Sequence, residues 1–116
     1  MTSTKYDEVT KTRSDEQLLM LFKIGCEQAF SEIVRRYAPM IRRQALSLAG
    51  AHAEAEDLVQ EGLMGLLSAV RTFHFKTASF RTYASVCVRN SMLSVVRRIA
   101  ASRRVPPCEL VSIDEQ

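Results

Sequence analysis

Apolar side chains recur at three- and four-residue steps along most of the chain, which is the spacing of one face of an α-helix. The pattern predicts helices over residues 15–24, 27–49, 53–73 and 79–102. In the second of these, the recurring apolar positions are Phe30, Ile33, Val34, Tyr37, Ile41 and Leu48. We therefore expect an all-α fold, a compact bundle of about four helices.

Residues that start or stop helices support these boundaries. Ser14 followed by Gln17 is the pattern of a capping box, and Gly25 suits the position just after a helix end. Gly50 is expected to end the second helix. Pro39 lies inside that helix, where it should cause a kink or remove one hydrogen bond.

The third predicted helix has two different faces when its residues are placed 100° apart. Its core stripe consists of Leu58, Val59, Gly62, Leu63, Leu66, Ala69, Val70 and Phe73. The opposite face carries Asp57, Gln60, Glu61, Met64 and Ser68, with Leu67 at the border. Charged groups around exposed apolar side chains are typical of a protein docking surface, although an ordinary solvated face is the alternative.

The fourth predicted helix is asymmetric in another way. Its expected inward stripe consists of Phe80, Ala84, Cys87, Val88, Ser91, Val95 and Ile99. The other side carries Thr82, Val86, Arg89, Asn90, Leu93 and Arg97, with Tyr83 at its edge. Arg neutralises phosphate, Tyr can stack on a base and Asn can hydrogen-bond a base edge, so this face suits nucleic acid. The alternative is a surface helix with a Tyr at the margin of the core.

The charges along the chain are more informative than the net charge of +3. Residues 53–70 hold four acids and no Lys or Arg, whereas residues 71–104 hold eight bases and no acid. This division indicates two surfaces with different partners, of which the basic one would attract a polyanion. A solvated basic face remains the alternative.

Several functional classes find no support in the sequence. Cys26, Cys87 and Cys108 are an odd number without C-x-x-C spacing, which argues against a disulfide framework and a four-thiolate zinc site and favours reduced thiols in the cytosol. His52 and His74 have no ligand partners at metal spacing. No apolar run is long enough for a membrane span, and no nucleophile–base pair or phosphate loop is present. We expect no enzyme activity, metal or cofactor.

Two ordered motifs resemble region 2 of bacterial sigma-70-family transcription factors. Residues 57–73 read DLVQEGLMGLLSAVRTF, and residues 79–90 follow at the family's spacing with SFRTYASVCVRN. Upstream, residues 15–19 (DEQLL) and 29–37 (AFSEIVRRY) resemble the opening helices of that domain. The tail 105–114 (VPPCELVSID) resembles the linker of sporulation-type sigma-H relatives.

The resemblance implies a protein partner for the third helix. In the family, this helix docks on the clamp helices of the largest catalytic subunit of core RNA polymerase. The corresponding contacts are Asp57, Gln60, Glu61, Leu63, Met64 and Leu67. Leu63 falls on the core side of the helix, so the resemblance and the periodicity disagree about that residue.

The resemblance also implies that the fourth helix recognises and melts the promoter −10 element, mainly through the non-template single strand. Phe80, Thr82 and Tyr83 match positions that receive a flipped adenine or stack near it. Asn90 and Leu93 match positions that face the upstream base pairs of the element.

The implied DNA surface also includes three arginines and a position at which this chain departs from the housekeeping members of the family. Arg81, Arg89 and Arg97 would meet phosphates. Val86 and Cys87 replace the paired tryptophans of housekeeping members, which removes a stacking contact worth roughly 1–3 kcal/mol per base. This replacement is typical of an alternative sigma factor that melts promoters less strongly.

The expected organisation is a disordered segment at residues 1–13, a region 2 domain at 14–104 and the start of a linker at 105–116. Region 4, which reads the −35 element, does not follow, so we expect an isolated domain of a longer factor. The expected function is promoter recognition and melting with core polymerase, without catalysis of its own. The alternative is a sigma-like interaction bundle that binds polymerase or an anti-sigma factor without contacting DNA.

Overall fold

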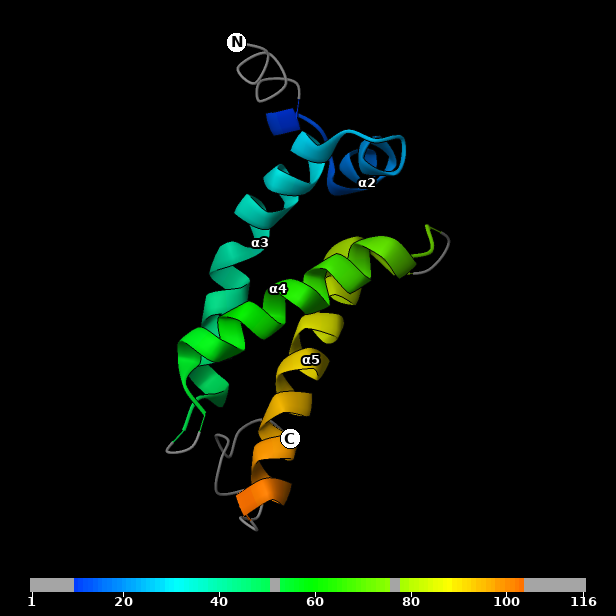
Figure 1. The fold of residues 1–116 in the computed structure, drawn as a ribbon. Helices are drawn as coiled ribbons and strands as arrows, with labels where there is room; N and C mark the ends of the chain where they lie inside the picture. The colour runs from blue at the N-terminus through cyan, green and yellow to red at the C-terminus, as the bar shows by residue number, and fades with distance from the viewer. Residues whose placement is uncertain (1–9, 51–52, 76–77, 104–116) are drawn as a thin grey trace.

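The computed structural model describes residues 10–50, 53–75 and 78–103, and these form helices joined by short connections. The helices are α2 (Asp15–Lys23), α3 (Glu27–Leu48), α4 (Ala55–Thr72) and α5 (Phe80–Arg103) (Figure 1). No β-strand occurs within these ranges. The all-α prediction is confirmed, and each helix boundary lies within two residues of the predicted one.

The ends of α2 have the predicted capping interactions. The Ser14 hydroxyl accepts a hydrogen bond from the Gln17 N–H (3.1 Å), and the Gln17 side chain accepts one from the Ser14 N–H (2.9 Å). At the other end, Gly25 has a φ of 104°, a conformation that glycine adopts without a steric penalty. The Cys26 N–H then donates to the Leu21 carbonyl (3.0 Å) and completes a Schellman motif.

Residues 10–13, the described part of the segment before α2, pack against α3. Thr10 is buried, and Arg36 donates hydrogen bonds to the carbonyls of Thr10 and Lys11 (both 3.1 Å). Residues 1–9 lie outside the described part of the chain, as do the predicted linker and Cys108. Pro39 does not interrupt α3, which is one continuous helix.

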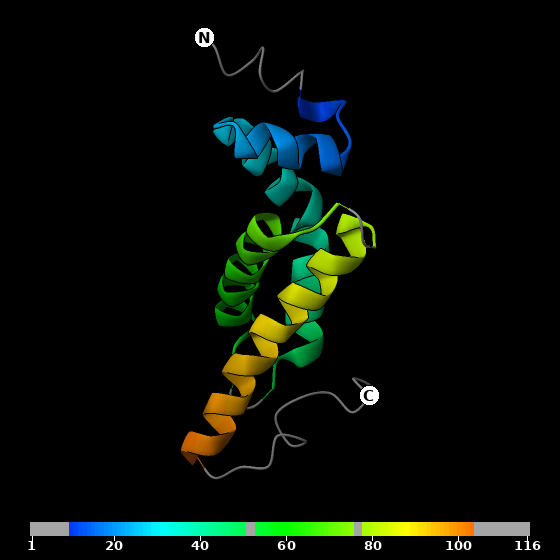
Figure 2. The same ribbon diagram turned by 90° about the vertical axis from the view of Figure 1, so that its right-hand side faces the viewer.

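The helices are arranged so that α4 runs beside both α3 and α5 (Figure 1). Figure 2 shows α2 lying across the N-terminal end of α3. Glycines allow the close approach of α4 to its neighbours. A Cβ atom at Gly65 would lie 2.8 Å from the Cys87 carbonyl oxygen, and one at Gly62 would lie 2.5 Å from the Met92 methyl group. A larger residue at Gly65 would push the α5 backbone away, whereas at Gly62 the flexible end of the Met92 side chain would have to move.

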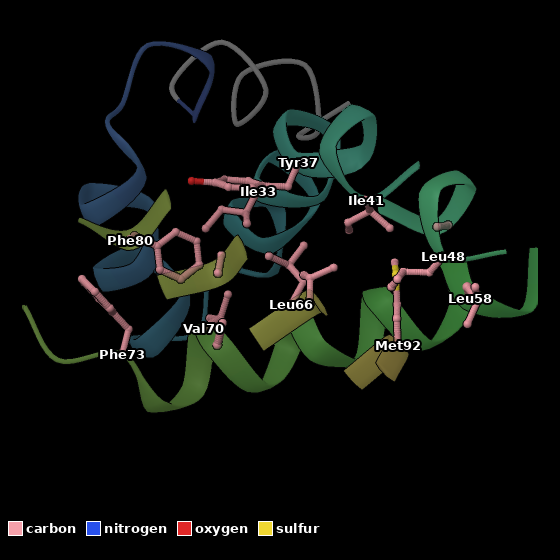
Figure 3. Packing of buried hydrophobic residues seen from close by; sticks show 14 of the residues in the cluster. Ile33, Tyr37, Ile41, Leu48, Leu58, Leu66, Val70, Phe73, Phe80 and Met92 are labelled. Atoms are coloured by element: carbon pink, nitrogen blue, oxygen red, sulfur yellow. The ribbon is translucent and has the colours of Figure 1, made fainter. Parts of the chain in front are cut away.

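The core runs along the bundle and includes a cluster of aromatic rings. Phe80 lies between Tyr37 and Phe73, with edge-to-face ring centroids 5.6 and 5.4 Å away, respectively (Figure 3). Six of the eight residues predicted for the core stripe of α4 are buried, and Val59 and Leu63 are half-buried. The predicted α4 face is therefore correct.

The predicted core face of α5 is displaced by about one position. The buried residues follow a strict four-residue step: Phe80, Ala84, Val88, Met92, Val96 and Ala100. Met92, Val96 and Ala100 were not predicted, whereas the predicted Cys87, Ser91, Val95 and Ile99 are only half-buried. The reason is that a strict four-residue step turns the buried stripe by about 40° around the helix at each step, so it departs from the straight stripe that a 3.6-residue period predicts.

Candidate protein and nucleic-acid interfaces

The outward face of α4 presents most of the residues predicted to dock on polymerase. Asp57, Gln60 and Met64 are exposed, and Met64 keeps 62% of its side-chain surface accessible. Glu61 and Leu67 are half-buried. These five side chains form one continuous surface along the helix, because their spacing of three or four residues places them on one side.

Leu63 differs from the other predicted docking residues. It is half-buried and packs against the core cluster, so it belongs partly to the interior. Periodicity placed Leu63 in the core and the resemblance placed it on the docking surface, and its half-buried position lies between the two. Leu63 can offer only one edge to a partner.

A groove beside this face adds residues that the sequence did not predict. It has a volume of about 540 Å³ and lies between α3 and the first turns of α4. Arg42 and Leu46 line it from α3, and Glu56, Asp57 and Gln60 from α4. Leu46 is 63% exposed. Its apolar side chain interrupts the polar face of α3, and this interruption is a sequence signal that could have identified Leu46 as a groove residue.

The outer face of α5 presents the predicted DNA-binding residues, with one exception. Arg81, Thr82, Val86, Asn90 and Arg97 are exposed. Three further predicted contacts are half-buried: Tyr83, Arg89 and Leu93. The exposed group combines two arginines with two polar side chains and one valine on the solvent-accessible part of the helix.

Phe80 is the exception, because none of its side chain is exposed. Its ring packs against Tyr37 and Phe73 in the core and presents no surface to a base. The prediction that Phe80 contacts DNA therefore does not fit this structure. The periodicity had placed the same residue on the inward stripe, and burial agrees with that assignment.

The first turn of α5 is held by α2 and α3. The Phe80 N–H donates to the Glu16 carboxylate (3.3 Å), and the Thr82 N–H donates to the Ser79 hydroxyl (3.3 Å). The Arg81 guanidinium lies over the Tyr37 ring, 5.0 Å from its centroid. The start of the predicted DNA-reading helix is thus held by contacts with α2 and α3 as well as by its own capping hydrogen bond.

An ion-pair network joins α2 to α3 beneath this turn. Arg36 binds Glu32 and Asp15 (both 2.9 Å), and Asp15 also accepts a hydrogen bond from the Tyr37 hydroxyl. Arg35 binds Glu32 at 2.6 Å. Hydrogen bonds from Arg35 and Arg36 lower the pKa of Glu32 to about 2 against the opposing effect of burial.

Tyr37 titrates differently from an exposed tyrosine. Burial and the hydrogen bond to Asp15 raise the pKa of its hydroxyl above the usual value. The sequence analysis assigned no role to this network, because its members are separated by up to 22 residues. It holds α2 and α3 together and carries no reacting group.

Residues 33–102 match the sigma-70 region 2 family. The chain belongs to this family. Its sequence is 28% identical to the RNA polymerase sigma-H factor of Bacillus licheniformis over 102 residues, which cover 87% of this chain and 46% of the relative. It is 39% identical to the RNA polymerase sigma factor FliA of Pseudomonas aeruginosa over 83 residues, covering 68% of this chain and 34% of the relative.

The sigma-70 region 2 chain spans about half the length of the curated sigma-H relatives that it matches. No solved structure matches it significantly. The family match covers all of α4 and all but the last residue of α5, which carry the candidate interfaces, together with α3 from residue 33 onward. The resemblance drawn from the two sequence motifs is therefore confirmed at the level of the family.

The region 2 domain shows neither a metal-ligand cluster nor a membrane-length apolar helix in the part that the structure describes. His74 is exposed, and His52 lies outside the described residues. Cys26 and Cys87 are free thiols, both half-buried.

Proposed function

We propose that this region 2 domain binds core RNA polymerase through α4 and captures the promoter −10 element through α5. Support comes from the family and from relatives named as RNA polymerase sigma factors. The single observation that carries the assignment is a pair of oppositely charged surfaces on adjacent helices. Each is exposed, and neither forms an ion pair within the described residues.

The proposed docking surface is the outward face of α4, and its partner is the clamp-helix coiled coil of the polymerase. Asp57 and Glu61 lie one turn apart and would meet basic side chains. Met64, 62% exposed, would provide the apolar contact between them and the partner. A rim of charge around an apolar centre gives specificity together with burial of apolar surface.

The proposed mechanism at α5 is base capture. Tyr83 would stack on a base that has left the duplex, and Asn90 would hydrogen-bond a base edge. Arg81, Arg89 and Arg97 would neutralise the phosphates of the same strand. Capture offsets the few kcal/mol that unstacking a base costs, so the open form of the −10 element accumulates.

The test is a titration of labelled oligonucleotides, with core polymerase present. We expect the single-stranded non-template −10 sequence to bind more tightly than the same sequence as duplex, because a base in a duplex offers no free face. Tyr83→Ala should cost about 1–3 kcal/mol of binding free energy, the value of one stacked base.

Two results would contradict base capture. One is equal binding of duplex and single strand, and the other is unchanged affinity in Tyr83→Ala. Both would favour a sigma-like domain that binds polymerase, or an anti-sigma factor, without contacting DNA. Polymerase retention is measured on the same samples. It distinguishes a domain that binds polymerase without contacting DNA from one that has failed to bind polymerase at all.

A further inference from the structure

The side chain of Tyr83 on α5 is tied to the end of α4. Its hydroxyl oxygen lies 2.6 Å from the hydroxyl oxygen of Thr72, the last residue of α4. Its ring packs on Phe73, with centroids 5.6 Å apart and ring planes inclined by 49°. Two consecutive residues at the end of α4 therefore fix the position of a ring that α5 carries.

The direction of this hydrogen bond follows from the chemistry of the two hydroxyls. Thr72 donates its only hydroxyl proton to the Ser68 carbonyl, at 2.8 Å. The proton between Thr72 and Tyr83 must then come from Tyr83, which donates to the Thr72 oxygen. The result is a directed chain from Tyr83 through Thr72 to the α4 backbone. The Tyr83 oxygen keeps its lone pairs for a further donor.

We propose that Thr72 is a positioning residue that holds the Tyr83 ring in the orientation needed to stack on a base. This inference rests on the proposed function, in which Tyr83 contacts a −10 base. A half-buried tyrosine without the hydroxyl contact would turn more freely about its side-chain bonds. Ordering the ring before DNA arrives removes that entropic cost from the binding step.

The contact has a structural consequence for the two proposed surfaces. Thr72 and the docking residue Asp57 belong to the same helix, α4. The base-stacking ring is therefore held by the helix that would dock on polymerase, and its orientation relative to that helix is set by side-chain contacts as well as by the α4–α5 connection.

Three substitutions isolate the hydroxyl contact. Thr72→Val removes the acceptor and keeps the shape of the side chain, whereas Thr72→Ser keeps the hydroxyl. Tyr83→Phe removes the donor and keeps the ring. Thr72→Val and Tyr83→Phe should each weaken binding of the single-stranded −10 sequence about two- to tenfold, the range for one hydrogen bond. The double variant should be no weaker than the weaker single variant, because both remove the same contact.

A spectroscopic readout separates positioning from a general loss of stability. A 2-aminopurine base at the flipped position of the oligonucleotide loses fluorescence when it stacks on Tyr83. With core polymerase present and the DNA site saturated, Thr72→Val should leave more fluorescence than the natural chain, and Thr72→Ser should restore the quenching. Helicity of the free chain should remain unchanged in both variants, and the thermal midpoint of Thr72→Val should fall by no more than the loss of one exposed hydrogen bond allows.

Each outcome has a defined meaning because Tyr83→Ala is measured in parallel. If Tyr83→Ala weakens binding while Thr72→Val retains the natural affinity and quenching, Thr72 does not position the ring. The inference about Thr72 then fails, and the proposed role of Tyr83 in base capture stands. If Tyr83→Ala binds DNA as the natural chain does, the proposed function fails, and the role of Thr72 fails with it. Loss of the nuclear Overhauser contacts between Tyr83 and Phe73 in free Thr72→Val would support the inference without DNA.

Discussion

The charged side chains of α2 and α3 are arranged differently from those of α4 and α5. Among residues 10–50, 53–75 and 78–103, the ion pairs found all involve α3: Glu32 pairs with Arg35 and Arg36 within this helix, and Arg36 also pairs with Asp15 of α2. Part of the charge on α2 and α3 is therefore used within the bundle, whereas the acids of α4 and the arginines of α5 form no ion pair among the described residues.

This difference separates charges that hold the fold from charges that can serve a partner. Glu32 is only 6% exposed and would be costly to bury without its arginines. Asp57 and Arg97 are exposed and cost little to leave unpaired. An unpaired surface charge gains energy only when a partner of opposite sign arrives. The comparison therefore predicts losses of stability on one side and losses of binding on the other.

The largest expected effect on stability is that of Arg36→Met. This change leaves Glu32 and Asp15 without their shared partner and removes two hydrogen bonds to backbone carbonyls. We expect a loss of about 3 kcal/mol in the free energy of unfolding, measured by urea denaturation. The matched control is Arg35→Met, whose side chain is 64% exposed and which should lose less than about 1 kcal/mol. Equal losses in both variants would contradict a structural role specific to Arg36.

The second prediction concerns the dependence of stability on pH. The pKa of Glu32 is lowered from 4.5 to about 2 in the folded chain. Its contribution is therefore complete above pH 4.5 and disappears as the pH falls through about 2. Roughly 2 kcal/mol of this contribution should be lost between pH 5 and pH 3.

The control for this pH effect is Glu32→Gln, which cannot titrate. Glu32→Gln should be less stable than the natural chain at pH 7, and the gap should narrow as the pH falls. Urea denaturation at several pH values measures both chains. A gap that stays constant from pH 7 to pH 3 would mean that Glu32 does not titrate with a lowered pKa.

The smallest expected effect is that of Arg97→Ala on DNA binding. A phosphate contact carries no base information, so all single-stranded sequences should weaken alike. The slope of log K against log salt should become shallower by about 0.7, the contribution of one phosphate on a single strand. Arg43→Ala, an exposed arginine on α3, is the control and should leave the slope unchanged. A loss confined to one sequence would assign Arg97 to base reading instead.

The sequence predicted these features unequally, for physical reasons. Helical periodicity identified the buried and exposed faces of α4, because its core residues lie on a simple stripe. The same argument misplaced the face of α5 and missed Met92, because the buried residues of α5 repeat every four positions and the stripe turns by about 40° around the helix at each step. Phe80 was assigned to DNA from a motif, although its place in an aromatic cluster depends on Tyr37 and Phe73.

Contacts between distant residues were beyond a periodicity argument. Asp15 and Arg36 are 21 residues apart, and Thr72 and Tyr83 are 11 apart. Nothing in the local spacing links either pair, because each contact depends on how two helices meet. The charge division between residues 53–70 and 71–104 was visible in the sequence, since it needs no tertiary information. That the acids are unpaired was visible only in the structure.

The most direct test of separate partner surfaces on α4 and α5 is Glu61→Lys. Polymerase retention and single-strand DNA binding at low salt are measured on the same preparation, with helicity as the check on folding. The account predicts at least a tenfold loss of affinity for core polymerase, unchanged helicity, and DNA binding by the free chain that is unchanged or slightly stronger. Unchanged polymerase affinity in a folded Glu61→Lys variant, or a parallel loss of DNA binding, would contradict it.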